Sequence, residues 1–277
     1  MSQITANDIN KLRQITGAGI LDCKKALNEA NGDHEIAIDW LRKQGKKIAE
    51  KRLDREAKEG VVISQTTADN KTGYLMCLSC ETDFVAKNAD FIALANDILQ
   101  VAVKLNISSI ENLLNAPFKE TTVNNVILEK LAAIGEKIEI SKYQTISGEY
   151  VTSYIHGANR IGVLVALNAV SEEVGRNIAM QVAALNPVAI SADKISQDVV
   201  TREQNIILEQ LKNEPKMQGK SMEMLTKISQ GKLQAFFKEQ TLLGQPFVKN
   251  QDQSVEDYIN SVNKNLKISD FKRITVG

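Results

Sequence analysis

The chain has 277 residues, of which 43% are hydrophobic and 25% are charged, which is the composition of a folded globular protein. The 34 Lys and Arg balance the 34 Asp and Glu, and this neutrality argues against a dedicated nucleic-acid binder, which normally carries a basic excess. No run of 18 apolar residues and no apolar signal-peptide core occur, so we expect no membrane-spanning helix and no secretion signal.

Several kinds of site are excluded by what the sequence lacks. Its two histidines, His34 and His156, lie far apart in the sequence, which argues against a multi-histidine metal site. Neither a P-loop, nor a G-x-G-x-x-G fingerprint, nor a nucleophile elbow occurs. We therefore expect no metal and no bound cofactor. Three cysteines, an odd number at low density, are typical of a reducing cytoplasm, so we expect a cytoplasmic location.

The first 45 residues predict three short helices. Thr5 with Asp8 forms a capping box at the start of the first helix, and the glycines of 17–19 end it. A second helix is expected over 20–30, and a third follows and ends near Gly45.

A charged stretch over 42–58 holds eight Lys and Arg against three Asp and Glu. We interpret it as a solvated helical linker. The alternative is contact with RNA or with an acidic protein, which is disfavoured because no aromatic residues interleave the basic ones.

From Gly60 the pattern of apolar residues changes from a helical to a strand period. Two strands joined by a polar turn form a predicted hairpin, followed by helices and a further strand. A second hairpin and helix follow, so the pattern occurs twice and predicts a duplicated α+β unit. The segments are strands at 60–66 and 73–82, helices over 93–105 and from a Ser108–Glu111 capping box to Ile134 with Gly135 at its end, a strand at 137–145, strands at 150–156 and 160–170, and a helix from Ser171.

Residues 190–242 carry little strand signal and predict two helices broken near Pro215. A helical hairpin projecting from the core is the natural geometry. After it, Ser254 caps one more helix, and 270–276 closes the chain as a strand.

Cys77 and Cys80 form a lone C-x-x-C inside a predicted strand. Residues three apart on a strand point to opposite faces, so packing is favoured over a redox pair or half a metal site. His156 lies at a hairpin turn without a nucleophile partner, which favours a solvated side chain over a catalytic one.

The segment 82–88 lies at a strand-to-helix junction, where Thr82 or Asp83 can cap the following turn. Phe84 stands beside two polar residues at this surface-prone corner. Two alternatives remain open: Phe84 packs inward as a hydrophobic staple, or it is an exposed aromatic anchor for a protein partner.

Two long segments resemble the signatures of bacterial elongation factor Ts. Residues 12–27, LRQITGAGILDCKKAL, resemble the N-terminal signature, and 80–87, CETDFVAK, resemble the second. Shorter matches occur at 156–165 and 243–248, so the resemblance covers nearly the whole chain in order.

The resemblance implies an α+β fold. An N-terminal three-helix, ubiquitin-associated-like docking domain with its basic linker would span 1–55. A duplicated core of antiparallel sheets would consist of subdomains at 56–145 and 146–277. The helical hairpin inserted at 190–242 would resemble the coiled coil of the family, which implies a homodimer or a 2:2 assembly.

By the same resemblance, the chain is a translation factor without enzymatic chemistry. It would act as the guanine nucleotide exchange factor for elongation factor Tu, binding both its GDP-bound and its nucleotide-free form, with no membrane and no direct nucleic-acid contact. The implied contact residues are Asp83 and Phe84 at the exchange site, Arg13, Ile20, Leu21 and Lys24 on the first docking surface, Ile134, Gly135 and His156 in the core, and Val248 nearer the C-terminus.

Two departures from the family pattern stand out. Lys249 replaces the methionine that we associate with its position, and the sequence ends directly after the last strand. Longer members continue into a helix that also touches the partner, so we carry over no residue for that contact.

Three rival interpretations remain. A ribosome- or RNA-binding protein would use 42–58, a thiol enzyme would use Cys77 and Cys80, and a plain structural protein would use neither. The neutral charge and the aromatic fraction of 5% count against the first, strand geometry against the second, and the two specific signatures against the third.

Overall fold

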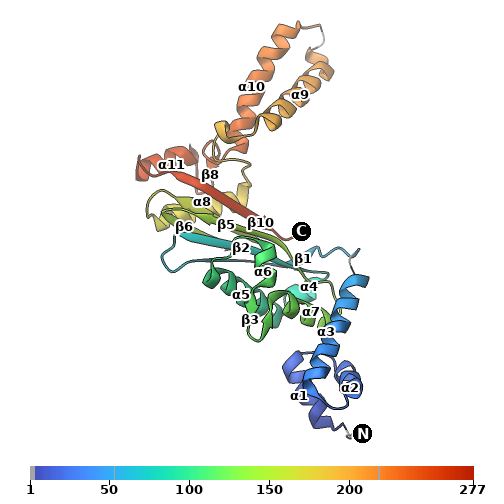
Figure 1. The fold of residues 1–277 in the computed structure, drawn as a ribbon. Helices are drawn as coiled ribbons and strands as arrows, with labels where there is room; N and C mark the ends of the chain where they lie inside the picture. Colours follow the sequence, from blue (N-terminus) through green and yellow to red (C-terminus); the bar gives the residue numbers. More distant parts are fainter. Residues whose placement is uncertain (1–3, 53, 218) are drawn as a thin grey trace.

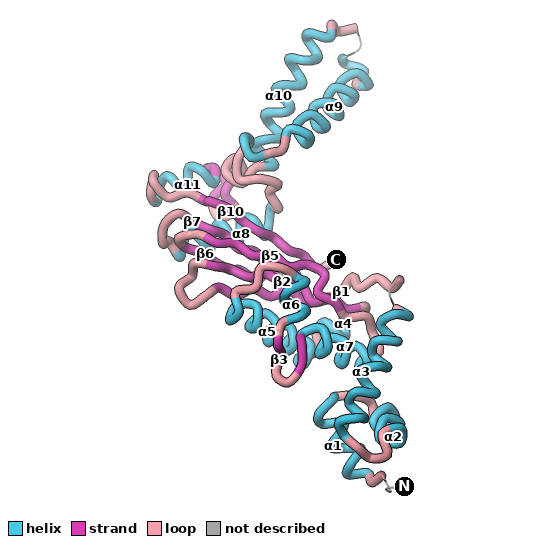
Figure 2. The backbone as a smooth tube through the Cα atoms, viewed as in Figure 1, coloured by secondary structure: helices cyan, strands magenta, loops and turns pink. Residues whose placement is uncertain are grey.

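The computed structural model describes residues 4–52, 54–217 and 219–277. A small helical bundle lies at the N-terminal end of an elongated molecule, a core of sheets and helices lies in the middle, and a helical hairpin projects from the far end (Figure 1). The strands of the core sheets pair antiparallel. Helices lie against these sheets (Figure 2), so the α+β class predicted from the sequence is confirmed. Within the described ranges, no helix is both long and apolar enough to span a membrane.

The N-terminal bundle contains three helices, as predicted. Thr5 and Asp8 form the expected capping box, and Gly17 ends the first helix with a φ of 68°, a left-handed conformation that favours glycine. Leu12, Cys23 and Leu27 are completely buried between the helices. The helices are α1 (Ala6–Thr16), α2 (Ile20–Glu29) and α3 (His34–Lys51).

The prediction that the third helix ends at Gly45 is wrong, because α3 continues to Lys51. Its second half packs on α7 (Val123–Ile134) of the core. A Cβ atom on Gly45 would lie 2.8 Å from the carbonyl oxygen of Leu128 and 3.3 Å from the Cβ of Ala132. Glycine therefore allows two helices to approach here. The linker predicted over 42–58 is helical as far as Lys51, but one face of that helix packs on the core and only the other is solvated.

The first sheet follows the helical bundle and is covered on one face by helices. Its central strand is the second strand of the predicted hairpin, and its apolar side chains pack on α5 and α7. Ser109 caps α6 by accepting from the Asn112 amide, one residue later than the Ser108 cap predicted from the sequence. The elements are β1 (Glu59–Thr66), β2 (Thr72–Cys80), α4 (Asp83–Ala86), α5 (Ala89–Leu105), α6 (Ile110–Asn115), β3 (Pro117–Phe118), β4 (Thr121–Thr122), α7 and β5 (Glu139–Ser147).

The second sheet has the same strand order as the first. The hairpin β6–β7 is extended by a later strand that pairs with β7, just as β5 pairs with β2. Its outer face packs on α8 and α11. The elements are β6 (Tyr150–His156), β7 (Ile161–Leu167), α8 (Glu172–Leu185), β8 (Pro246–Phe247), β9 (Asn250–Ser254), α11 (Val255–Val262) and β10 (Ile268–Thr275).

The inner faces of the two sheets pack against each other. A Cβ on Gly162 would lie 2.5 Å from Leu75 and 2.6 Å from Val62, so glycine permits this close approach. Cys77 lies in the buried cluster between the sheets, whereas Cys80 lies on the other face beneath α5. The prediction that the two cysteines face opposite sides is confirmed, and the core is layered helix, sheet, sheet, helix.

The predicted helical hairpin is present between α8 and β8. A parallel bridge between Ala189 and Thr241 closes its base, and Leu211, Leu225 and Leu233 pack between its arms. The elements are η1 (Ala192–Lys194), α9 (Gln197–Asn213), η2 (Pro215–Met217) and α10 (Met222–Gln240). The hairpin projects well beyond the sheets (Figure 1).

Candidate partner-binding site

Phe84 lies on an exposed corner between β2 and α5. Thr82 caps the single turn of α4 by accepting from the Val85 amide, and Ala86 is buried on the inner side of that turn. Because Val85 and Ala86 pack inward, the side chain of Phe84 points to solvent and is 84% exposed. The inward staple is therefore wrong, and the side chain is exposed, as the alternative of a partner anchor requires.

Asp83 places a negative charge next to this aromatic ring. Its Oδ2 lies 2.6 Å from Nζ of Lys87, one turn along the chain. The hydrogen bond from Lys87 holds the pKa of Asp83 below its ordinary value, so the carboxylate is ionised at neutral pH. The corner therefore presents an apolar ring beside a fixed ion pair.

Two glutamates fasten this corner to the end of α7. Glu136 accepts from the Thr82 amide at 3.0 Å and from the Thr82 hydroxyl at 2.7 Å. In the opposite direction, Glu81 accepts from the amide of Lys137 at 2.6 Å. We call this reciprocal pair of contacts the clasp.

The clasp brings four of the implied contact residues together. Ile134 and Gly135 end α7 directly before Glu136, and Gly135 takes the left-handed φ of 79° that a helix end of this kind requires. They therefore lie beside the corner that carries Asp83 and Phe84. Sequence reasoning missed Glu81 and Glu136, although each is adjacent to a residue already singled out.

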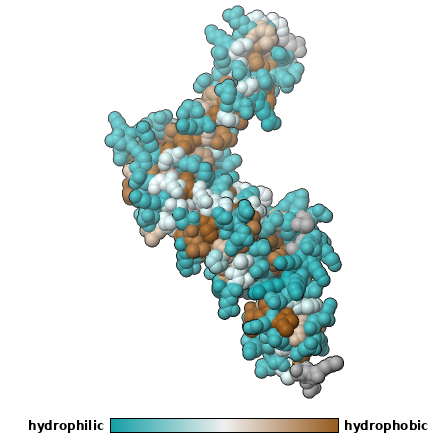
Figure 3. Space-filling model, in the orientation of Figure 1, coloured by the Kyte–Doolittle hydropathy of each residue, from teal (hydrophilic) through white to brown (hydrophobic). Residues whose placement is uncertain are grey.

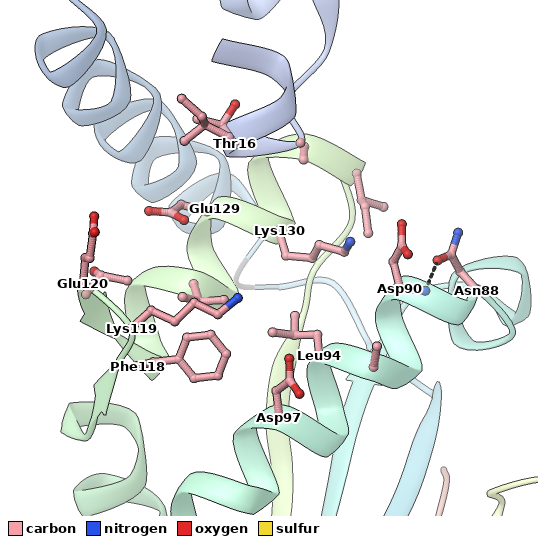
Figure 4. A pocket seen from close by; sticks show the side chains of 17 residues that line it. Thr16, Asn88, Asp90, Leu94, Asp97, Phe118, Lys119, Glu120, Glu129 and Lys130 are labelled. Carbon is pink, nitrogen blue, oxygen red and sulfur yellow. Dashed lines mark hydrogen bonds between the residues drawn. The ribbon is translucent and has the colours of Figure 1, made fainter. Parts of the chain in front are cut away.

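A groove of about 740 Å³ begins at this edge and runs between the core and the N-terminal bundle. In Figure 4, Lys130 extends from α7 toward Asp90 at the start of α5, while Lys119 and Phe118 enter from the β3–β4 hairpin. Charges of both signs surround an apolar floor that includes Leu94. Ile134 lines the groove on the core side, and Ile15, Thr16 and Gly17 line it on the bundle side.

The bundle carries the second group of implied contact residues on its surface. Leu21 is 80% exposed and Ile20 is 52% exposed, and both lie on the first turn of α2. Arg13 on α1 and Lys24 on α2 are also exposed. Hydrophobic side chains gather on the surface of this bundle (Figure 3), so it offers an apolar patch accompanied by cations.

His156 lies at the same end of the core as the Phe84 corner. It is exposed at the end of β6, and Arg160 in the following turn pairs with Glu59 at 2.8 Å. Glu59 also lies opposite Cys80 in the register of β1 and β2, and Cys80 is the last residue of β2 before the corner. His156 contacts the hydroxyl of Tyr154 at 3.0 Å, as expected of a polar surface group.

Val248 is not brought to this edge. It is half-buried beside β8, where its amide donates to Gln181 of α8 at 2.8 Å. Strand β8, which directly precedes it, lies near the base of the helical hairpin, across the core from α4 (Figure 1).

Several basic residues of 42–58 are engaged by carboxylates. Arg42 donates to Glu129 at 2.6 Å, and Arg52 and Arg55 both contact Glu81. Burial by itself would raise the pKa of Glu81, but the hydrogen bonds from the Lys137 amide and Arg52 outweigh it and leave this pKa lowered. These arginines fix protein contacts, which weakens the RNA-binding alternative.

The thiols have no reactive environment. Burial raises the pKa of Cys80 to about 12, and its Sγ donates to the Thr82 carbonyl at 3.2 Å. Over 4–52, 54–217 and 219–277, no three or more His, Cys, Asp and Glu side chains are grouped to hold a metal ion.

Comparison with known proteins agrees with the two signatures. A family model described as "Elongation factor TS" matches residues 81–277. Elongation factor Ts of Christiangramia forsetii is 46% identical over 280 residues, covering 100% of both chains. That of Flavobacterium psychrophilum is 42% identical and covers 100% of both chains. That of Thermobifida fusca is 39% identical and covers 100% of this chain and 99% of its own. The chain therefore belongs to the elongation factor Ts family of translation elongation factors.

Proposed function

We propose that this chain promotes the release of GDP from elongation factor Tu by binding to it non-covalently. The observation that carries the proposal is the 84% exposure of Phe84 on a corner whose backbone is held by the clasp. Burial of a large exposed aromatic ring in a partner favours binding, and because the clasp already holds the backbone of this corner, little backbone entropy would be lost.

The exchange follows from thermodynamic coupling between two ligands of the same GTPase. A protein that binds nucleotide-free Tu more tightly than GDP-bound Tu must weaken GDP binding by the same ratio of affinities. Phe84 would insert into the GTPase domain, with Asp83 beside it, and disturb the magnesium and phosphate site. Displacing a divalent cation removes charge compensation from the phosphates, so the nucleotide dissociates faster.

The remaining contacts would be spread over several surfaces. The patch formed by Arg13, Ile20, Leu21 and Lys24 would be one docking surface, and the groove beside Ile134 and Gly135 would receive an amphipathic element of Tu. His156 would extend the contact along the core. Val248 would meet a different part of Tu, since it lies across the core from the corner.

We further propose the division of the chain into a docking domain at 1–55 and core subdomains at 56–145 and 146–277. The shared strand order of the two sheets supports a duplicated unit. The hairpin at 190–242 would form a coiled coil that joins two chains, giving a homodimer or a 2:2 assembly with Tu. Location in the cytoplasm and the absence of nucleic-acid contacts belong to the same proposal.

The coupling can be tested by measuring affinity for two forms of Tu. Titration calorimetry with purified Tu should give a lower Kd for the nucleotide-free form than for the GDP-bound form. Equal affinities would contradict the proposal, because a ligand without differential affinity shifts no equilibrium.

A further inference from the structure

The carboxylate of Glu81 serves two parts of the molecule at once. Its Oε1 accepts from the Lys137 amide at 2.6 Å, which is one half of the clasp. The same carboxylate also contacts Nη1 of Arg52 and, at 3.4 Å, Nη1 of Arg55. Arg52 directly follows α3, the long helix that begins in the N-terminal bundle.

Helix α3 is therefore fastened to the core at points along its length. Arg42 pairs with Glu129, Gly45 packs on Leu128, and Arg52 reaches Glu81 at the corner. The Glu81 side chain is only 13% exposed, so solvent screens its ion pair with Arg52 less than it screens ion pairs on an open surface. The bundle and the Phe84 corner are thus joined through one helix and one carboxylate.

We infer that Glu81 is a positioning residue that fixes the docking surface of the bundle relative to Phe84. This inference rests on the function proposed above. If α3 is held, both surfaces can reach Tu together without reorientation. If its C-terminal end is released, α3 is held only by the contacts of Arg42 and Gly45 and can tilt about them. A smaller fraction of molecules then has the correct geometry, and the apparent affinity falls by that fraction.

Glu81→Gln separates the two tasks of the carboxylate. The amide oxygen of glutamine still accepts from Lys137, so the corner keeps its shape, but the charge that attracts Arg52 and Arg55 is lost. Arg52→Gln removes the Arg52 contact alone and leaves Glu81 charged. Glu59→Gln is the control, because it removes the same charge from another Arg–Glu pair, that of Arg160, which is more exposed and involves neither α3 nor the clasp.

The experiment measures GDP release from Tu as the concentration of each full-length variant is raised. We expect both Glu81→Gln and Arg52→Gln to raise the half-saturating concentration roughly 3- to 10-fold. The maximal rate should stay within about twofold of wild type, since Phe84 is unchanged. The double variant should be no worse than Glu81→Gln alone, because that change already removes the contact with Arg52. Hydrogen exchange of amides 54–58 should speed up in both variants and not in Glu59→Gln.

The outcomes distinguish this inference from the proposed function. An unchanged half-saturating concentration in Glu81→Gln, with Phe84→Ala impaired, would overturn the positioning role alone. A fall in maximal rate without a change in half-saturation would also overturn it, because Glu81 would then act only at the corner. If wild-type protein releases no GDP, the proposed function fails, and hydrogen exchange alone still tests whether Glu81 holds the segment after α3.

Discussion

The backbone of Gly45 lies against the carbonyl of Leu128, so that a Cβ on Gly45 would come within 2.8 Å of that oxygen. Gly231 on α10 is also within a helix, yet an added Cβ there would meet nothing within 4 Å. The two glycines therefore form a matched pair for one substitution.

Replacing each of these glycines by alanine should change stability in opposite directions. Gly231→Ala should stabilise the hairpin by about 0.5–1 kcal/mol, because alanine has the higher helix propensity. Gly45→Ala should destabilise the α3–α7 contact by about 1–3 kcal/mol through overpacking. Urea unfolding followed by circular dichroism measures both. A stabilised Gly45→Ala variant would show that α3 does not pack on α7 as described.

The exposed patch on the bundle should contribute to binding without contributing to folding. Leu21 is 80% exposed, so Leu21→Ser should change the free energy of unfolding by less than about 0.5 kcal/mol. Loss of an apolar anchor should still cost more than about 1 kcal/mol of binding, or roughly fivefold in Kd for Tu. Val170→Ser, at a residue that is 77% exposed outside the bundle, is the control and should leave Kd unchanged.

The helical hairpin should govern self-association more than exchange. Val199, Ile206, Met222 and Met224 are exposed apolar residues on its arms, and such patches mark interaction surfaces. Replacing 197–240 by a short turn is feasible because Ala189 and Thr241 are paired at the base. Light scattering should then report a smaller mass while GDP release largely survives. Unchanged mass together with complete loss of exchange would refute this assignment.

The buried thiols should resist alkylation in the folded protein. A pKa of about 12 for Cys80 means that its thiolate, the nucleophilic form, is scarce at neutral pH and grows only as the pH rises toward that value. Iodoacetamide at pH 7.5 should therefore label Cys80 only after unfolding, as mass spectrometry of peptides would show. Rapid labelling of Cys80 in native protein would instead favour the thiol-enzyme alternative.

The order and type of most elements could be predicted from the sequence, because long periodic segments and their caps carry local signals. The capping box at Thr5 and the glycine end at Gly135 are such cases. The predicted helix end at Gly45 is wrong because a glycine can either end a helix or allow close packing within one. Only the position of α7 decides between the two.

The candidate site was predictable only in part. Phe84 lies on a helix of a single turn, and one turn is too short for the spacing of apolar residues in the sequence to show which side chains face solvent. The clasp joins Glu81 and Glu136 to partners distant in the sequence, and no local pattern signals such contacts. The local clue to these contacts is that Glu81 follows the end of a strand and Glu136 follows the end of a helix.

Phe84→Ala tests the central claim most directly, in a paired measurement of unfolding and of GDP release. Because the ring is 84% exposed, thermal unfolding should change by less than about 1 kcal/mol, whereas truncating a core phenylalanine costs roughly 3–5 kcal/mol. Stopped-flow release of a fluorescent GDP from Tu should be accelerated by the wild-type chain. The variant should lose about 2–4 kcal/mol of differential binding, which weakens coupling to nucleotide release roughly 30- to 1000-fold. A variant that accelerates GDP release as well as wild type would contradict the account.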